Sequence, residues 1–229
     1  MGIIRKITQE TGYRFLNFFT FDVTHKNGKE SKYFVASRAK KMEELKAVTH
    51  KNNADGVVIY SVYGPKRDRV VLIRQYRYPI NDYVYEFPAG LVEENEDFGE
   101  AAVREMKEET GLTFHPLKVD SIYSEPRFTT VGMTDESCAT VYGYADGSCS
   151  IAGLEESEEL EIVLADKKEV RRILKEERVA LMCAYMLMHF LHAEDGRPFD
   201  FLHAEDDRSL DFLHAEDDRS FDFTEPEEG

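Results

Sequence analysis

One segment of 23 residues, from Gly90 to Leu112, constrains the fold of this 229-residue chain more than any other stretch. It reads GLVEENEDFGEAAVREMKEETGL, with apolar residues at helical spacing ahead of Gly111. Glycine is common immediately after the last turn of a helix, because it adopts left-handed backbone angles without strain. The segment therefore predicts a helix over residues 98–110 that ends at Gly111.

Three glutamates share one face of this predicted helix, since Glu105, Glu108 and Glu109 follow one another at about 100° per residue. An adjoining apolar stripe, expected to anchor the helix to a sheet, consists of Ala102, Val103 and Met106. Like charges one turn apart destabilise a helix, so the carboxylates need a cation or solvent to compensate them. Hard divalent cations take such oxygen ligands, and magnesium combines one or two carboxylates with substrate phosphates. A solvated acidic face is the alternative, but it accounts for neither the glycines nor the spacing of Arg104 from Glu96.

The fixed residues of the segment follow the order G-x5-E-x7-R-E-U-x-E-E-x-G-U, in which U is apolar. This order resembles the signature of the Nudix hydrolases at every defined position. The resemblance implies an α/β fold, namely a Nudix α/β/α sandwich with an N-terminal β-hairpin subdomain, and a loop–helix–loop metal site. Members of that family cleave nucleoside diphosphates linked to another moiety.

The resemblance also implies a role for each fixed residue. Glu105 and Glu109 resemble the principal metal ligands, which the carbonyl of Ala89 often joins, and Glu108 resembles an additional ligand or a catalytic carboxylate that positions water. The expected cofactor is Mg2+, with Mn2+ as an alternative, and it would neutralise the diphosphate and activate water. The residues expected to be structural are Gly90, Glu96, Arg104 and Gly111.

Two stretches upstream narrow the choice of branch. VLIRQYRYP over residues 71–79 and YEFPAG over residues 85–90 resemble the ADP-ribose pyrophosphatase branch, including its relatives that cleave other nucleotide sugars. Arg74 and Arg77 are the candidates to bind substrate, because a guanidinium can clamp phosphate with bidentate bonds. A surface or structural ion pair is the alternative for either arginine. Glu86 either orients a substrate hydroxyl or pairs with an arginine.

A loop beyond the predicted helix supplies the candidate general base. The same branch commonly has a proline shortly after the signature, followed by a loop with a catalytic glutamate. Here Pro126 lies 14 residues after Leu112, and GMTDE follows over residues 132–136. Glu136 is therefore the candidate catalytic base that acts on water, with an ordinary loop carboxylate as the alternative. The loop departs from the commoner Pro-Gly wording, since it has Val131 before its glycine.

The N-terminal region contains a hairpin signal. Asn27-Gly28 lies between two alternating runs and predicts that Arg14–Val23 pairs with Glu30–Ser37. Members of this branch often have an extra β subdomain that exchanges across a homodimer, so the resemblance implies a homodimer. The candidates to stack on a ligand from this subdomain are Phe15, Phe18, Phe19, Phe21 and Tyr33.

Hydrophobic patterning predicts the remaining elements of a mixed α/β sandwich. The expected strands lie at residues 56–63, 70–76, 83–87, 117–123, 137–144 and 159–164, and a long helix is expected over 167–191. The expected domains are an N-terminal β subdomain for dimerisation (1–50), a Nudix hydrolase domain (51–192) and an acidic repeat tail (193–229).

Charge separates this tail from the rest of the chain. The formal net charge is -16, from 29 basic and 45 acidic residues, and residues 193–229 contribute -11 of it. FLHAEDGRPFD, FLHAEDDRSLD and FLHAEDDRSFD follow one another over residues 190–222 with a period of 11. The favoured interpretation is a duplicated, mostly solvated appendage. The alternatives are a docking or oligomerisation element and a calcium site, although EF-hand spacing is missing.

Composition limits the partners and the compartment. The negative charge argues against electrostatic capture of nucleic acid or of an anionic membrane. Three cysteines without CxxC spacing fit reduced thiols, and the N-terminus lacks the apolar run of a signal peptide. We therefore expect a cytoplasmic protein with neither nucleic acid nor membrane as a partner.

The predicted function is metal-dependent hydrolysis of the diphosphate of ADP-ribose or a related nucleoside diphosphate sugar, giving AMP or another NMP and a sugar phosphate. One alternative is a nucleotide-sensing Nudix-like module that binds without significant hydrolysis. Another is an interaction scaffold in which the repeats are the functional part.

Overall fold

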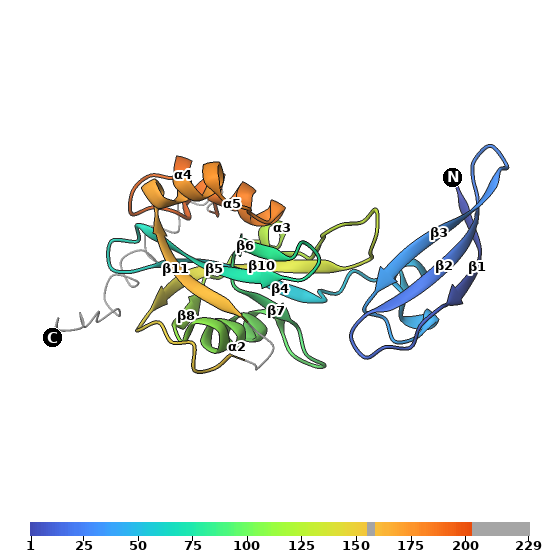
Figure 1. Cartoon of the computed structure of the whole chain (residues 1–229), viewed down its shortest axis with the longest axis horizontal. Coiled ribbons are helices and arrows are strands. Elements are labelled where there is room, and N and C mark those ends of the chain that lie inside the picture. Colours follow the sequence, from blue (N-terminus) through green and yellow to red (C-terminus); the bar gives the residue numbers. More distant parts are fainter. Residues whose placement is uncertain (155–158, 203–229) are drawn as a thin grey trace. The chain divides into compact units, whose positions relative to one another are not determined.

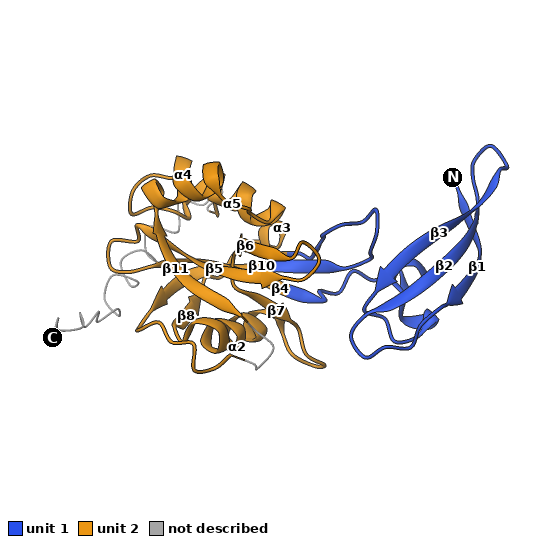
Figure 2. Cartoon of the chain, viewed as in Figure 1, with its two compact units in different colours: residues 1–56, 125–139 blue, residues 57–124, 140–229 orange. Residues whose placement is uncertain are grey.

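The computed structural model describes residues 1–154 and 159–202. The chain forms two compact units: unit 1 consists of residues 1–56 and 125–139, and unit 2 of residues 57–124 and the chain from Thr140 onward (Figure 2). The loop predicted to carry the general base therefore belongs to the same unit as the N-terminus.

Unit 1 is built on an antiparallel sheet in the order β1-β2-β3. Its elements are β1 (Ile3–Gln9), β2 (Asn17–Thr24), β3 (Glu30–Ser37), the 3-10 turn η1 (Met42–Glu44), the one-turn helix α1 (Lys46–Thr49) and the short strand β9 (Arg127–Phe128). β2 and β3 pair from Asn17↔Ser37 to Thr24↔Glu30, which confirms the predicted hairpin. Gly28 supplies the left-handed angle of its turn, with φ 82°.

The core of unit 1 follows the two-residue period of β2. Phe19 and Phe21 are buried on one face of this sheet, where they pack with Val35 and Leu45. Phe18 points to the other face and stacks on Phe34, with 6.0 Å between ring centroids. Of the five candidates for stacking on a ligand, Phe19 and Phe21 are thus core residues, whereas the other three are exposed.

The larger sheet has eight strands among the described residues, with the central order β11-β5-β4-β10-β8. β6 pairs with β5, β7 with β4, and β9 with β10. The strand bounds are β4 (Gly56–Tyr63), β5 (Arg69–Arg77), β6 (Asp82–Glu86), β7 (Ala89–Leu91), β8 (Thr113–Pro116), β10 (Ser137–Asp146) and β11 (Leu160–Asp166). Every residue of β4 before Tyr63 is buried, as expected of a central strand.

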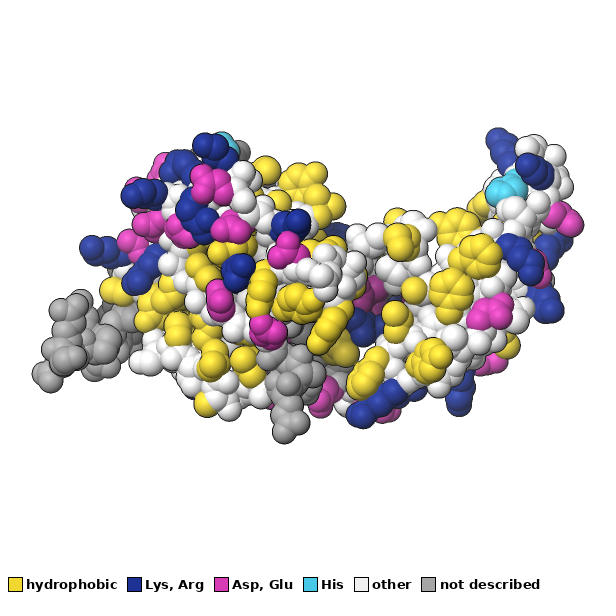
Figure 3. Space-filling view, viewed as in Figure 1, with side chains coloured by type: hydrophobic (Ala, Val, Ile, Leu, Met, Phe, Trp, Pro, Cys, Tyr) yellow, Lys and Arg dark blue, Asp and Glu magenta, His cyan; other side chains and the backbone are white. Residues whose placement is uncertain are grey.

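Helices cover both faces of this sheet, which confirms the predicted α/β/α sandwich. The helix α2 (Phe98–Thr110) lies on one face, and α4 (Lys167–Glu176) and α5 (Leu181–His192) lie on the other (Figure 1). Basic and acidic side chains mix over α4 (Figure 3), where Arg172 bridges Glu169 at 2.7 Å and Glu177 at 2.6 Å.

The helix predicted over 98–110 is confirmed at both ends. Asp97 caps its N-terminus by accepting a hydrogen bond from the Gly99 N–H at 2.8 Å, and Gly111 ends it with φ 73°. Ala102 and Met106 are buried against the sheet as expected, but Val103 is 41% exposed, so its assignment to the apolar stripe is wrong. Ala101 belongs to the apolar stripe instead: it is buried and lies one turn before Glu105 on the side of the helix that faces the sheet.

Two other predictions are wrong for identifiable reasons. Residues 117–123 do not form a strand: β8 ends at Pro116, and the Asp120 side chain accepts from the Ile122 N–H at 2.9 Å to begin the short helix α3 (Ser121–Ser124). The helix predicted over 167–191 is two helices, α4 and α5. Their connection pairs with β6, since the Tyr85 N–H donates to the Arg178 carbonyl at 2.9 Å.

Counted from its glutamate, the first repeat unit spans residues 194–202, and its apolar residues belong to the folded core. Phe199 and Leu202 are 2% and 6% exposed, and Leu202 ends the 3-10 turn η2 (Asp200–Leu202). The interpretation of a mostly solvated appendage is therefore wrong for these residues. The rest of the repeat, from residue 203 onward, lies outside the described residues.

Among the described residues, no helix combines the length and the apolarity that crossing a membrane requires. The three cysteines, Cys138, Cys149 and Cys183, are free thiols.

Candidate active site

A close contact between β7 and α2 organises the candidate active site. A Cβ atom added to Gly90 would lie 1.9 Å from Cδ and 2.0 Å from Oε1 of Glu105. No side chain fits at that position without moving the carboxylate, so the glycine is required for Glu105 to approach the backbone. The structure thus gives a physical reason for the glycine that begins the 90–112 segment.

Glu109 reaches the same turn from the next position on the helix face. It is 3% exposed, and its Oε2 accepts a hydrogen bond from the Ala89 N–H at 3.1 Å. Burial of a carboxylate is costly unless it is paired or hydrogen-bonded, and this amide contributes to that compensation. Two carboxylates therefore converge on the backbone of residues 89–90.

Arg104 ties the loop before the helix to the helix itself. Its Nε and Nη2 both donate to the Glu96 carboxylate at 2.9 Å, and Nη2 also donates to the Leu91 carbonyl at 2.9 Å. This bidentate pair, together with the Glu93 N–H, lowers the pKa of Glu96 below its ordinary value, chiefly through the Arg104 hydrogen bonds. The geometry explains why an arginine and a glutamate recur at this separation.

The remaining nitrogen of the same guanidinium contacts two other glutamates. Nη1 of Arg104 donates to Glu105 at 2.8 Å and to Glu108 at 3.1 Å. Within the part of the chain that the structure describes, no three acidic, histidine or cysteine side chains are arranged to hold a metal ion. A cation at this turn would therefore compete with Arg104 for Glu105 and Glu108.

The donor set at the turn nevertheless fits a hard divalent cation. Glu105 and Glu109 bring carboxylate oxygens to the backbone of Ala89 and Gly90, and Glu108 is half-exposed beside them. Oxygen donors of this kind are the ligands that Mg2+ and Mn2+ prefer.

Gly111 is fixed by both conformation and packing. Its φ of 73° is left-handed, and a Cβ atom there would lie 2.7 Å from Cβ of Ser150. The Gly111 N–H donates to the Lys107 carbonyl at 3.0 Å, which closes the helix.

The three predicted substrate-binding residues of unit 2 take part in two different ion pairs. Nε of Arg77 donates to Oε2 of Glu86 at 2.7 Å, and Nη2 forms an ion pair with the same oxygen at 2.7 Å. Arg74 contacts Glu161 on the neighbouring strand at 3.4 Å and lies 4.2 Å over the ring of Tyr83. The structure therefore joins two of the three candidates, and it places Arg74 in a different contact.

Glu136, the candidate base, is held by residues of unit 1. Nε of Arg38 donates to its Oε1 at 2.7 Å, and the Thr129 hydroxyl donates to its Oε2 at 3.2 Å. The same loop attaches to β3, since the Ala36 N–H donates to the Met133 carbonyl at 2.9 Å. Sequence reasoning missed Arg38, because no local pattern relates residues 98 positions apart.

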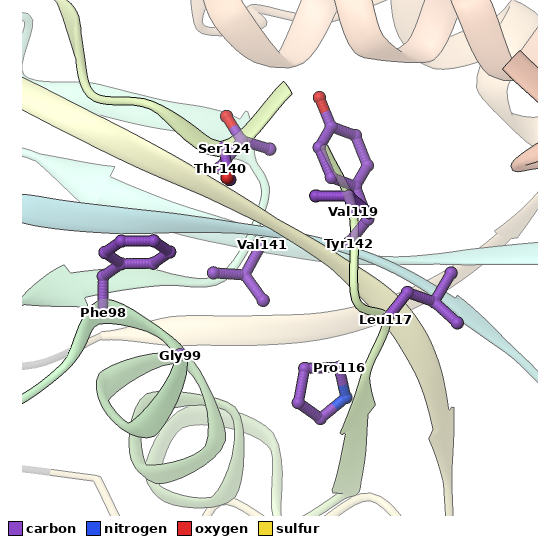
Figure 4. A pocket seen from close by; sticks show the side chains of 9 residues that line it. All are labelled: Phe98, Gly99, Pro116, Leu117, Val119, Ser124, Thr140, Val141 and Tyr142. Atoms are coloured by element: carbon purple, nitrogen blue, oxygen red, sulfur yellow. The ribbon is translucent and has the colours of Figure 1, made fainter. Parts of the chain in front are cut away.

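An apolar cavity of about 210 Å³ opens beside the first turn of α2. In Figure 4, Phe98 and Gly99 from that turn face Val141 on β10, and Pro116 and Leu117 lie below and beside them. Ser124 and Thr140 supply hydroxyl groups at its edge. No motif in the sequence indicated this cavity.

A profile of the NUDIX domain matches residues 52–180. The chain is 28% identical over 139 residues to the ADP-ribose pyrophosphatase of Saccharomyces cerevisiae, a match that covers 59% of this chain and 57% of that protein. It is 40% identical over 72 residues to the ADP-sugar pyrophosphatase of Mus musculus, which covers 30% and 33% of the two chains.

The chain spans about half or less of the length of these relatives. A crystal structure of ADP compounds hydrolase superposes with a TM-score of 0.54 at 19% identity, over 76% of this chain and 83% of that one, which shows a shared fold. Since the matched profile covers more than half of its length and the signature residues meet at one turn, the chain belongs to the Nudix family.

Proposed function

We propose that this protein hydrolyses the diphosphate of ADP-ribose or of a related nucleoside diphosphate sugar with the help of a divalent cation. The observation that carries the proposal is the convergence of Glu105 and Glu109 on the backbone of Ala89 and Gly90. The names of the two pyrophosphatase relatives support the substrate class.

In this proposal, Glu105, Glu109 and the Ala89 carbonyl hold the cation, and Glu108 is a further ligand or positions the attacking water. Mg2+ is the expected ion, with Mn2+ as an alternative. When bound, such an ion neutralises diphosphate charge, activates water and stabilises the leaving phosphate.

Arg104 has a supporting role that its five N–H donors allow. The bonds from Nε and Nη2 to Glu96 and Leu91 keep the loop against the helix, so Nη1 could give up Glu105 and Glu108 to a bound cation without loss of those bonds. Gly90, Glu96, Arg104 and Gly111 therefore position the ligands and do not contact the reacting atoms.

Substrate contacts are assigned to Arg74, Arg77 and Glu86. Arg74 is the candidate to bind phosphate, because a guanidinium matches phosphate geometry. Two nitrogens of Arg77 hold Oε2 of Glu86, which orients the carboxylate to accept a hydrogen bond from a sugar hydroxyl.

Glu136 is assigned the role of general base. The Arg38 and Thr129 hydrogen bonds orient its carboxylate, and a carboxylate fixed in this way accepts a proton from water as water attacks phosphorus. The products from ADP-ribose would be AMP and ribose 5-phosphate, and from other substrates an NMP and a sugar phosphate.

The proposed assembly and location follow from the family resemblance and the composition. We assign residues 1–50 to a dimerisation subdomain, residues 51–192 to the hydrolase domain and residues 193–229 to a tail. The protein is proposed to be a cytoplasmic homodimer without nucleic-acid or membrane partners.

A substrate panel tests the proposal. The full chain is incubated with ADP-ribose, GDP-mannose, UDP-glucose and NADH, each with Mg2+, with Mn2+ and with EDTA, and products are separated by chromatography. Turnover of a nucleotide sugar that EDTA abolishes is expected. Binding of ADP-ribose by calorimetry without turnover of any of the four would favour the nucleotide-sensing alternative and overturn the hydrolytic proposal.

A further inference from the structure

The first repeat unit docks on an aromatic cluster of unit 2, defined by Tyr60, Tyr123, Tyr142, Tyr144 and His189. Phe199 enters this cluster, with its ring centroid 5.4 Å from that of Tyr60 and 5.3 Å from that of Tyr144. Both contacts have the edge-to-face geometry that aromatic pairs prefer.

A second aromatic side chain of the same unit contacts the cluster two residues later. The ring centroid of Phe201 lies 4.0 Å from that of His189 and 5.7 Å from that of Tyr142. The Tyr123 hydroxyl donates to the Phe201 carbonyl at 2.8 Å. Together with buried Leu202, these residues form an anchor of sequence Phe-Asp-Phe-Leu.

An ion pair within the same unit stabilises the anchor. Nε of Arg197 donates to the Asp200 carboxylate at 2.7 Å. Gly196, one residue earlier, has a left-handed φ of 77°. The anchor thus combines apolar side chains on either side of an aspartate with an arginine three residues before that aspartate.

The same chemistry recurs twice in the sequence. The second unit has Arg208 followed by Leu210-Asp211-Phe212-Leu213, and the third has Arg219 followed by Phe221-Asp222-Phe223-Thr224. Each copy keeps the arginine-to-aspartate spacing and the aromatic residue after the aspartate. These copies lie outside the described residues, and only their sequences enter the argument.

We propose that the aromatic cluster is a binding site for the repeat as a peptide, and that the second unit, residues 205–213, is an alternative occupant within the same chain. A tethered copy has a high effective concentration at the site. Looping out one unit adds little closure entropy, because that entropy grows only slowly with loop length. Exchange within a chain is therefore favoured over exchange between chains.

The two occupants are not equivalent. The first unit has Gly196 at its left-handed position, whereas the second has Asp207, which adopts that conformation at greater cost. Leu210 also replaces Phe199 with a smaller side chain. The first unit is thus the main occupant, and the second takes its place when the first anchor is weakened.

Full-length variants test this exchange through their melting temperatures. All carry Phe223→Ala to silence the third unit, and they add either F199A/F201A, or L210A/F212A, or all four substitutions. L210A/F212A alone should leave the Tm unchanged, and the quadruple combination should lower it by more than the sum of its parts. If L210A/F212A adds nothing to F199A/F201A, the second unit does not bind and the proposal is overturned.

A fluorescence measurement keeps the test valid if F199A/F201A fails to fold. The chain has no tryptophan, and Phe201 is only half-buried, so Phe201→Trp introduces a single reporter in the anchor. A peptide of residues 205–213 in excess should displace the anchor and shift the emission to longer wavelength, whereas the same peptide with Phe212→Ala should not. An unchanged spectrum with either peptide would overturn the proposal. The proposal would also be overturned if, without peptide, the Tm difference between the variants grew with protein concentration. The second unit would then bind another copy of the chain.

Discussion

The carboxylates of the 90–112 segment and the candidate base Glu136 are held in contrasting ways. Glu105 and Glu109 are placed by helix geometry and by a turn fewer than 25 residues away in sequence. Glu136 is held by Arg38, 98 residues earlier, within unit 1. The comparison teaches that the proposed metal ligands are placed by local sequence, whereas the proposed base depends on contacts with the N-terminal part of unit 1.

Replacing a local carboxylate should have the largest effect. Glu109→Gln should lower kcat on ADP-ribose by on the order of 10³-fold, because it removes the charge of a proposed metal ligand. The amide keeps an acceptor for the Ala89 N–H, so the Tm should not fall. Steady-state kinetics and circular dichroism check both expectations, with exposed Glu94→Gln as the matched control. An unchanged kcat would refute the ligand role.

Filling the space between Gly90 and Glu105 should have the next largest effect on activity. In Gly90→Ala, the added Cβ collides with Glu105, which should cost about 1–3 kcal/mol of stability and displace the carboxylate. We expect kcat to fall by about 10²-fold. Gly12→Ala is the control, since nothing lies within 4 Å of its added Cβ. A variant with normal Tm and normal kcat would show that the close contact is dispensable.

The long-range contact should give a smaller and more selective effect. Arg38→Ala removes the hydrogen bond from Nε to Glu136, so kcat should fall by about 10–10²-fold and KM should change little. Arg38→Lys should recover part of the rate. Arg14→Ala, whose contact is the ring of Phe15, is the control in the same unit. An unchanged kcat in Arg38→Ala would show that this hydrogen bond does not orient a catalytic Glu136.

The smallest expected effect concerns stability against pH. Since Arg104 lowers the pKa of Glu96, the pair stabilises the fold above the unfolded carboxylate pKa, and this contribution is lost as pH falls through the lowered value. Glu96→Gln should therefore lower the free energy of unfolding at pH 7 by about 1 kcal/mol and have less effect below pH 4. Urea unfolding at both pH values measures the difference. An equal loss in the free energy of unfolding at both pH values would mean that the charge of Glu96 does not contribute to stability.

The fold was most predictable where a pattern and its physical cause lie in one segment. The helix 98–110 follows from apolar spacing and Gly111, and the strands β4 and β5 follow from continuous apolar runs. Prediction failed where a distant partner decides the conformation. The long C-terminal helix is divided because residues 178–180 pair with Tyr85, and no local signal announces that pairing.

The site divides in the same manner. Spacing, together with the resemblance to the Nudix signature, indicated the glutamates, Arg104 and both glycines of the 90–112 segment, and the structure supplies contacts for each. It could not indicate Arg38, nor that Phe199 lies in the core, because acidic neighbours give the first repeat unit the composition of a solvated tail.

The three-way contact of Arg104 has a consequence for purification and storage. Its guanidinium already compensates Glu96 in the loop and Glu105 and Glu108 on the helix, so these carboxylates do not depend on an added ion to lie close together. Small zinc domains, in contrast, unfold when chelators remove their metal. EDTA should therefore abolish hydrolysis without lowering the Tm, and dialysis back into Mg2+ should restore hydrolysis.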